Sequence, residues 1–284
     1  MIKVEHLFHS YSGDDRYAVK DVNFEINKGE IFGFLGPSGA GKSTTQSILT
    51  GLLPLQKGTV TIDGQDIRRP HSAYFNKIGV SFERPNVYKK LSGMENLIFH
   101  AKMFRVPTAD PMALLQRVGL EDAAKKKAGD YSKGMLQRLV FVRSMLNYPK
   151  IWFLDEPTAG LDPTTAGKIK AIIREKQKEG TTIFLTTHNM YSAEELCDRV
   201  AFIVDGEINA IDSPRNLKLM YGERLVKIDY RENGTLKTET LSMTEEKDRQ
   251  RINGLVNQGS METIHSQEAT LEEIFIKVTG RGLE

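Results

Sequence analysis

The eight residues from Gly36 to Ser43 constrain this chain more than any other feature. They read Gly-Pro-Ser-Gly-Ala-Gly-Lys-Ser, with an apolar run at 31–35 before them and a helix-forming stretch at 44–53 after them. Glycines let successive backbone N–H groups turn inward around an anion, and the N-terminus of the following helix adds a positive dipole end. Lys42 can then contact the β- and γ-phosphates, and the Ser43 hydroxyl can ligate Mg²⁺. The pattern predicts a phosphate-binding loop for a nucleoside triphosphate.

The composition of the chain limits its possible partners and cellular compartment. The chain has 284 residues and a net charge of +2, so a strong field for nucleic acid is not indicated and we expect no nucleic-acid partner. Its single cysteine, Cys197, excludes an intrachain disulfide, and we expect it to be a small buried packing residue. Apolar runs stay well short of the roughly 20 residues of a membrane span. We therefore expect a cytoplasmic protein that reaches a membrane only through a partner.

The hydrophobic periodicity changes along the chain and divides it into blocks. Residues up to about 85 favour strands, the block at about 86–148 favours helices, and strands alternate with helices again up to 215. A smaller α/β unit is expected at 216–284, with a hairpin at Asn233-Gly234 and a last helix capped by Thr270. Other expected features are strands at 3–8, 22–26, 59–62, 78–82, 151–154 and 182–186, a helix cap at Ser192, and a solvated helix edge at 125–127.

Two acids follow the apolar run at 151–154. At the carboxyl edge of a parallel sheet, beside the phosphate loop, Asp155 can hold Mg²⁺ through water. Glu156 can then point at the γ-phosphate and polarise an attacking water. His188 follows the expected strand at 182–186, where an imidazole would reach the same phosphate. The order of these residues along the chain favours a catalytic set over isolated structural residues.

A second anion-binding element precedes the acidic pair. The segment 131–138 reads Tyr-Ser-Lys-Gly-Met-Leu-Gln-Arg, and Ser132 with the Gly134 N–H would stand at a helix N-terminus. Two phosphate-binding elements in one chain are a surplus unless one of them serves a neighbouring molecule. Asp162 lies on the loop after Glu156, where a facing subunit would make contact.

Taken together, these motifs resemble the nucleotide-binding subunit of ATP-binding-cassette (ABC) transporters. The resemblance covers residues 1–215 and implies a P-loop NTPase core with a parallel sheet, an N-terminal antiparallel β subdomain and an inserted helical subdomain. The small C-terminal α/β accessory unit expected at 216–284 lies beyond the part of the chain that the resemblance covers. The motifs stand in family order: the Walker A loop at 36–44, the Q-loop position near 83, the signature at 131–135, the Walker B strand at 151–156 and the switch histidine His188.

The resemblance also implies partners and ligands. Two ATPase subunits, expected to be identical copies, would dimerise head to tail around ATP and Mg²⁺, with Ser132, Lys133, Gly134 and Asp162 of one acting on ATP bound by the other. Tyr11 would stack on adenine, with Tyr17 or Phe8 as the alternative. The remaining ATP-binding residues would be Gly36, Pro37, Ser38, Gly39, Ala40, Gly41, Lys42, Ser43 and Thr44.

Two departures from the family pattern indicate which class of ABC ATPase this chain resembles. Glu83 stands where the family has glutamine; a carboxylate can ligate Mg²⁺ but adds negative charge near the γ-phosphate. The signature has Lys133 and Met135 in place of Gly and Gln. This signature and the C-terminal unit look like ATPases of the ABC-2 exporter class, which energise efflux of drugs, peptides, lipids, polysaccharides or sodium. The expected place is the cytoplasmic face of the membrane, against separate membrane-spanning subunits.

Other functions stay open at this point. A soluble ABC-type ATPase that acts on ribosomes or DNA usually has two cassettes, long coiled coils or zinc modules, and this sequence shows one cassette. An importer ATPase is a further alternative, which the signature and the C-terminal unit disfavour. A module that binds ATP without hydrolysing it would not need Glu156 and His188, although Glu83 leaves room for slow turnover.

Overall fold

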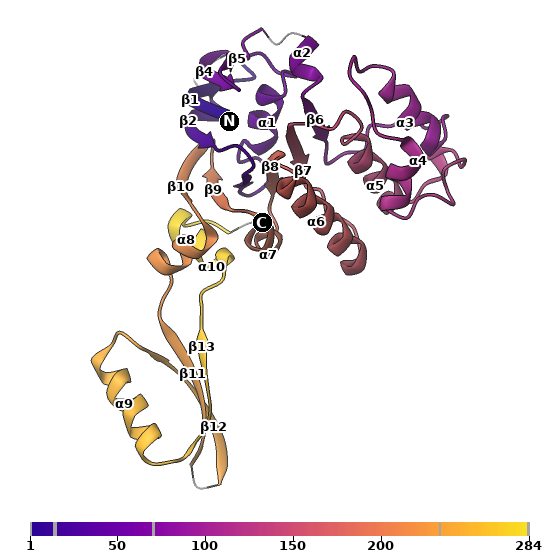
Figure 1. Ribbon diagram of the computed structural model, residues 1–284. Coiled ribbons are helices and arrows are strands. Elements are labelled where there is room, and N and C mark those ends of the chain that lie inside the picture. The colour runs from indigo at the N-terminus through magenta and orange to yellow at the C-terminus, as the bar shows by residue number, and fades with distance from the viewer. Residues whose placement is uncertain (1, 14–15, 70–71, 233, 283–284) are drawn as a thin grey trace. The chain divides into compact units, whose positions relative to one another are not determined.

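The computed structural model describes residues 2–13, 16–69, 72–232 and 234–282 (Figure 1). It divides into two compact units, the first ending at Ile211 and the second running from Asp212 to Gly282. Among the described residues, no helix combines the length and the apolar character that crossing a membrane would require.

A six-stranded sheet forms the centre of the first unit. Its order is β10-β9-β3-β8-β7-β6, and the pairings β9–β3, β3–β8, β8–β7 and β7–β6 are parallel. The central strands are buried throughout because elements cover both faces, as is usual for parallel sheets. The bounds are β3 Ile31–Leu35, β6 Ile78–Ser81, β7 Ile151–Asp155, β8 Thr182–Thr187, β9 Arg199–Val204 and β10 Glu207–Asp212.

This strand order brings the predicted motifs together. Leu35, at the end of β3, pairs with Thr187 of β8, and Asp155, at the end of β7, pairs with Thr186. The phosphate loop, the acidic pair and the histidine therefore leave three neighbouring strands at one edge, as expected for a ligand site at the carboxyl ends of parallel strands.

An antiparallel sheet and helix α1 (Lys42–Leu49) contribute to one hydrophobic core with the central sheet. The four strands have the order β2-β1-β4-β5. Phe24 of β2 stacks on Phe32 of β3, with ring centroids 5.4 Å apart, and Ile48 of α1 lies in the same buried cluster. The bounds are β1 Ile2–His9, β2 Val19–Ile26, β4 Lys57–Ile62 and β5 Gln65–Asp66.

The inserted helical subdomain and two later helices complete the first unit. Phe141 of α5 lies 5.0 Å from the Trp152 ring of β7, and Cys197, after α7, is buried against Gly33 of β3 as expected for a packing cysteine. The helices are α2 Ser72–Phe75, α3 Gly93–Ala101, α4 Pro111–Arg117, α5 Lys133–Arg143, α6 Pro163–Lys178 and α7 Met190–Leu196.

Three local predictions are wrong. Helix α1 ends at Leu49 rather than near 53, and Gly51, with a positive φ of 76°, follows its C-terminus. Helix α7 is capped by Asn189, whose side chain accepts from the Ser192 N–H, so Ser192 lies inside the helix instead of capping it. The lysines at 125–127 are exposed but do not lie on a helix: they lie in and directly after a turn, and Lys127 forms an isolated β-bridge with Ser92.

The described residues of the second unit form a three-stranded antiparallel sheet and three helices. Helix α9 packs over the sheet, where Arg251 donates to Glu239 at 2.9 Å and to the Tyr230 hydroxyl at 3.0 Å. The capping box at Thr270 is confirmed, whereas the predicted Asn233-Gly234 turn lies partly outside the described residues. The sheet order is β12-β11-β13, with β11 Leu225–Glu232, β12 Thr235–Ser242, β13 Met261–Gln267, α8 Pro214–Tyr221, α9 Glu246–Asn257 and α10 Leu271–Thr279.

Candidate nucleotide-binding site

The phosphate loop has the shape that its glycines predict. Gly41 caps α1 with a φ of 104°, and a Cβ there would lie 2.5 Å from the Ala18 carbonyl oxygen. A Cβ on Gly36 would lie 2.1 Å from the Ile203 carbonyl oxygen, so the backbone must pass close to β9. Gly39, at a φ of 82°, has no neighbour within 4 Å of a Cβ, which leaves space over the loop. These residues fit a polyphosphate.

Lys42 lies buried at the centre of this loop. Its Nζ donates to the Gly36 carbonyl at 2.6 Å and to the Pro37 carbonyl at 2.9 Å. Burial lowers the pKa of Lys42, while nearby Glu156, Asp155 and, more weakly, Glu83 act in the opposite direction. The amine is therefore held inside the loop, among carboxylates, where a phosphate oxygen could replace the weaker carbonyl partners.

Asp155 ends strand β7 as a buried carboxylate. The Thr186 hydroxyl donates to its Oδ1 at 2.5 Å, which favours the ionised form. Burial nevertheless raises the pKa of Asp155, and the charges of Glu156 and Glu83 raise it further. A divalent cation beside these acids would offset that repulsion. Mg²⁺ is commonly held by one or two carboxylates, a hydroxyl and phosphate oxygens, so Asp155, Glu83 and the exposed Ser43 fit it.

Glu156 makes direct contact with His188. Its Oε1 accepts from the His188 backbone N–H at 2.7 Å and from Nδ1 of the ring at 2.6 Å. Its Oε2 accepts from the Thr187 hydroxyl at 2.8 Å. Glu156 has a positive φ of 47°, a strained conformation for this residue type that tends to occur at functional sites. Carboxylate and imidazole thus form one hydrogen-bonded pair at the carboxyl edge of the sheet.

Tyr11 lies beside the helix that follows the phosphate loop. Its hydroxyl is 3.0 Å from the Thr44 hydroxyl, and its ring meets the buried His9 ring edge to face, with centroids 5.0 Å apart. The residue is 69% exposed. The alternatives, Phe8 and Tyr17, instead pack against each other with centroids 5.3 Å apart. Of the three, Tyr11 has the most accessible face next to the loop.

Glu83 lies exposed in the loop after β6. No described residue forms a hydrogen bond with its carboxylate, yet its charge acts on both Lys42 and Asp155. It therefore lies near the candidate Mg²⁺ site and contributes negative charge there.

The signature residues form a second group with the loop after Glu156. Ser132 caps α5, its hydroxyl accepting from the Met135 N–H at 3.2 Å, and Lys133 and Gly134 occupy the first turn. A Cβ on Gly160 would lie 3.5 Å from the Lys133 side chain, and one on Gly134 would lie 3.5 Å from Leu161. Asp162 caps α6 by accepting from the Thr165 N–H at 3.0 Å, and that hydrogen bonding lowers the pKa of Asp162. Ser132 thus lies at an exposed helix N-terminus, as the sequence predicts, and the anion nest there stays a prediction.

Two threonines that hold the carboxylates were not predicted. Thr186 and Thr187 end strand β8 and donate to Asp155 and Glu156, respectively. The available signal was a Thr-Thr pair immediately before His188, at the end of an otherwise apolar strand. A buried hydroxyl at that position needs an acceptor, and the acids on the neighbouring strand provide it.

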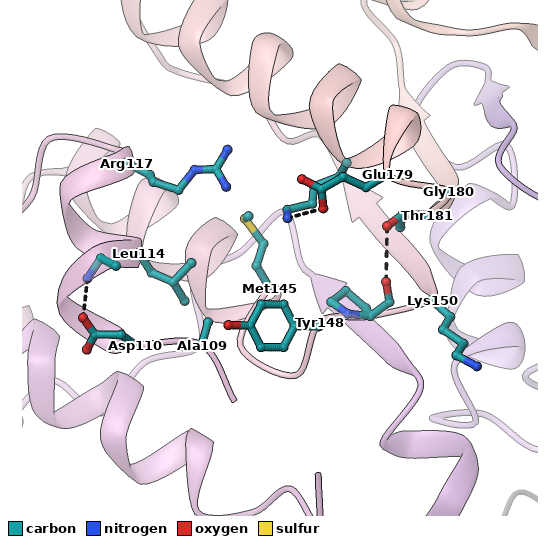
Figure 2. Close-up of a pocket in the computed structure, with 13 residues that line it drawn as sticks. Ala109, Asp110, Leu114, Arg117, Met145, Tyr148, Lys150, Glu179, Gly180 and Thr181 are labelled. Atoms are coloured by element: carbon teal, nitrogen blue, oxygen red, sulfur yellow. Dashed lines mark hydrogen bonds and ion pairs between the residues drawn. The ribbon is translucent and has the colours of Figure 1, made fainter. Parts of the chain in front are cut away.

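A separate cavity of about 470 Å³ lies at the opposite, amino-terminal end of β7 (Figure 2). It is lined by α4, the end of α6 and Tyr148. Among the lining residues, Lys176 forms an ion pair with Glu179 at 2.6 Å, and Arg117 forms one with Glu175. These two cations already have carboxylate partners, and Lys150 is the one other cation among the described lining residues, so the cavity lacks the cluster of free cations that a polyphosphate site would need.

Comparison with known proteins supports the same interpretation as the geometry of this site, a nucleotide-binding site. The family model described as "ABC transporter" matches residues 19–159. The chain is 49% identical over 284 residues, its full length and 94% of the relative, to a fluoroquinolones export ATP-binding protein of Mycobacterium tuberculosis. It is 35% identical over 229 residues, 80% of this chain and 98% of the relative, to the lantibiotic transport ATP-binding protein SrtF of Streptococcus pyogenes.

A solved structure adds a structural likeness. An ATP-binding cassette, determined as a dimer in a post-hydrolysis state with ADP and Pi, matches with a TM-score of 0.68 and 29% identity. The match covers 75% of this chain and 98% of that one. The fold predicted from the sequence, a P-loop NTPase cassette, is confirmed.

Proposed function

Because this chain belongs to the ATP-binding subunits of ABC transporters, we propose that it hydrolyses ATP to drive efflux through separate membrane-spanning subunits. The observation that carries the proposal is the Glu156–His188 pair at the same sheet edge as Lys42 and the phosphate loop. A chain that only bound ATP would not need a carboxylate and an imidazole joined at that place.

Each residue then has a role in the ATPase site. Lys42 and the backbone of residues 36–44 hold the phosphates, and Tyr11 stacks on the base. Ser43, Asp155 and Glu83 would hold Mg²⁺, which when bound would supply positive charge beside the β- and γ-phosphates. Glu156 orients and polarises the attacking water, while His188 fixes the Glu156 carboxylate.

The second group of residues acts on a facing subunit. In this proposal two copies dimerise head to tail, and Ser132, Lys133, Gly134 and Asp162 of one copy complete the ATP site of the other. The exposed helix N-terminus capped by Ser132 supports that role, because its N–H groups and dipole favour an anion. Residues 1–215 would form the nucleotide-binding domain, with its helical subdomain at 86–148, and residues 216–284 an accessory domain.

Membrane subunits would dock on the surface beside the Glu83 loop. There, a cavity of about 420 Å³ lies between the loop after β6, helix α3 and the end of α5. Leu52, Phe75 and Met103 line it and are 61%, 42% and 56% exposed. Apolar side chains gathered in an open cavity favour a protein partner over water.

The test is purification of the tagged full-length chain from membranes of its native host. We expect multi-span membrane proteins to co-purify and to stimulate its ATPase activity in liposomes. Because the relative of 49% identity is named for fluoroquinolone export, a fluoroquinolone is the first substrate to test for ATP-dependent movement. Recovery only with ribosomes or DNA would support the soluble alternative, and movement toward the cytoplasmic side would support an importer.

A further inference from the structure

The docking cavity contains one charged side chain. Among the described residues that line it, only Arg143 carries a permanent charge. Arg143 is the last residue of α5, and its exposure is only 7%. No carboxylate among the described residues forms an ion pair with it or is among the charges that shift its pKa. Arg143 is thus a buried cation without a counter-charge, on the wall of an open apolar cavity.

Neutral groups orient this guanidinium. Its Nη1 donates to the Asn86 carbonyl at 2.5 Å and to Nε2 of His100 at 3.2 Å, and its Nη2 donates to the Asn86 side-chain oxygen. Burial and the Arg143 charge lower the pKa of His100 to about 4, so the imidazole is neutral at pH 7 and accepts. These contacts use three of the five N–H groups of arginine and leave two.

Such an arrangement favours an anionic ligand of a particular shape. A buried charge is costly unless a charge of opposite sign accompanies it, and neutral acceptors offset only part of that cost. A guanidinium fork held in one orientation matches the two oxygens of a carboxylate. A free small anion would satisfy the charge but would leave Leu52, Phe75 and Met103 exposed, whereas a protein segment would cover them.

We propose that the cavity receives a segment of the membrane-spanning subunit in which apolar side chains surround one carboxylate, and that this carboxylate pairs with Arg143. The inference rests on the proposed function, since it names the chemistry of the partner at the docking surface. It also gives Arg143 a place in coupling, because the same residue holds Asn86, three residues beyond Glu83, to the helix that Ser132 caps.

The experiment uses the complex of the full-length chain with the membrane subunits that co-purify with it. Arg143→Lys keeps a cation and Arg143→Met removes it. We expect the methionine variant to lose at least tenfold in affinity for the membrane subunits and most of the stimulated ATPase rate. The lysine variant should keep a substantial part of both.

A water-soluble carbodiimide identifies the partner residue. In the Arg143→Lys complex it should join the new amine to the partner carboxylate as an amide, with loss of water, and mass spectrometry should locate the linked peptides. The matched control is Arg138→Lys on the same helix, where the guanidinium bonds the Val118 and Gly119 carbonyls outside the cavity. That variant should give no link to the same acid.

The outcomes separate this inference from the proposed function. If the wild-type chain recovers no membrane subunit, the proposed function fails. If the complex forms and Arg143→Met binds and responds like wild type, the charge pairing is wrong and the proposed function stands. Should Arg143→Met not fold, the carbodiimide result decides: an absent link overturns the pairing, and a link is checked by changing the partner acid to its amide, which should reproduce the loss.

Discussion

The Glu156 carboxylate accepts two hydrogen bonds from His188, one from the backbone N–H at 2.7 Å and one from Nδ1 at 2.6 Å. A carboxylate oxygen accepts, so Nδ1 is the donor of the ring hydrogen bond in this pair. Because Thr187 holds the second oxygen of Glu156, the carboxylate is fixed at both ends. In the proposed mechanism, a carboxylate fixed in this way would act on water without first reorganising.

Glu156→Gln should abolish most of the hydrolysis while ATP still binds. The amide keeps the shape of the side chain but cannot take a proton, so we expect a rate loss of about 10²–10⁴-fold. Size-exclusion chromatography should show an ATP-bound dimer that persists. The matched control is Glu207→Gln, which removes a surface ion pair with Lys20 and should leave the rate unchanged. Turnover within a few-fold of wild type would exclude Glu156 as the base.

Lys42→Ala should weaken nucleotide binding itself. The variant loses the buried cation that would hold the β- and γ-phosphates. A ligand at one hundred times its Kd stabilises a protein by about 2.7 kcal/mol, so the wild type should melt several degrees higher with Mg-ATP. The variant should lose most of that shift, whereas Lys168→Ala, on the exposed side of α6, should keep it. An unchanged shift in Lys42→Ala would place the nucleotide elsewhere.

Much of the site could be predicted because its residues sit next to strong local patterns. The Gly36–Ser43 loop follows an apolar strand, and Ser132 and Asp162 each precede a helix whose backbone N–H groups need acceptors. The contact between Glu156 and His188 could not be predicted from local pattern. It depends on β8 lying between β3 and β7, which is a property of strand order.

Helix ends were the weaker part of the prediction. Ser192 and Asn189 both suit an N-cap, and the choice depends on the Thr187 hydroxyl, which accepts from the Asn189 N–H and turns the chain there. The burial of Arg143 could not be predicted from the sequence, because an arginine inside a helix is usually solvated. Its burial arises from the tertiary approach of Asn86 and His100, which lie 57 and 43 residues away.

Glu83→Gln tests where this chain departs from its family. The change removes a negative charge that acts on Lys42 and Asp155 but keeps an oxygen that can ligate Mg²⁺. We expect hydrolysis by the isolated chain to persist at a somewhat higher Mg²⁺ requirement, and stimulation by the membrane subunits to change. Rates measured against Mg²⁺ concentration, with and without those subunits, check this. Superimposable curves would show that only the loop backbone matters.

Ser132→Arg should block hydrolysis without preventing a monomer from binding ATP, because in the proposed dimer the nest would act on the nucleotide of the facing copy. Mixing this variant with Lys42→Ala gives dimers in which one composite site is intact and the other is doubly damaged. We expect partial recovery of activity in the mixture, measured after mixed dimers are verified by mass. No recovery in verified mixed dimers would favour action within one copy, or two strictly coupled sites.

Because of His100, the stability of the protein should vary with pH in the mildly acidic range. Its pKa is about 4 in the folded chain against 6.5 unfolded, so the unfolded state binds more protons between these values. Stability should therefore fall as pH drops from about 6.5 to 4, by at most about 3 kcal/mol for this group.

His100→Gln removes that titration and can keep an acceptor for Arg143, so the two proteins should differ in slope over this pH range. Urea unfolding at half-unit pH steps measures the difference between wild type and variant. The remaining titratable groups, mainly carboxylates, titrate equally in both proteins, so their contributions cancel in that difference. We expect the stability advantage of the wild type to shrink as pH falls, because protonation of His100 would put a second cation 3.2 Å from the guanidinium. Parallel curves from pH 7 to pH 4 would show that His100 does not stay neutral on the wall of the cavity.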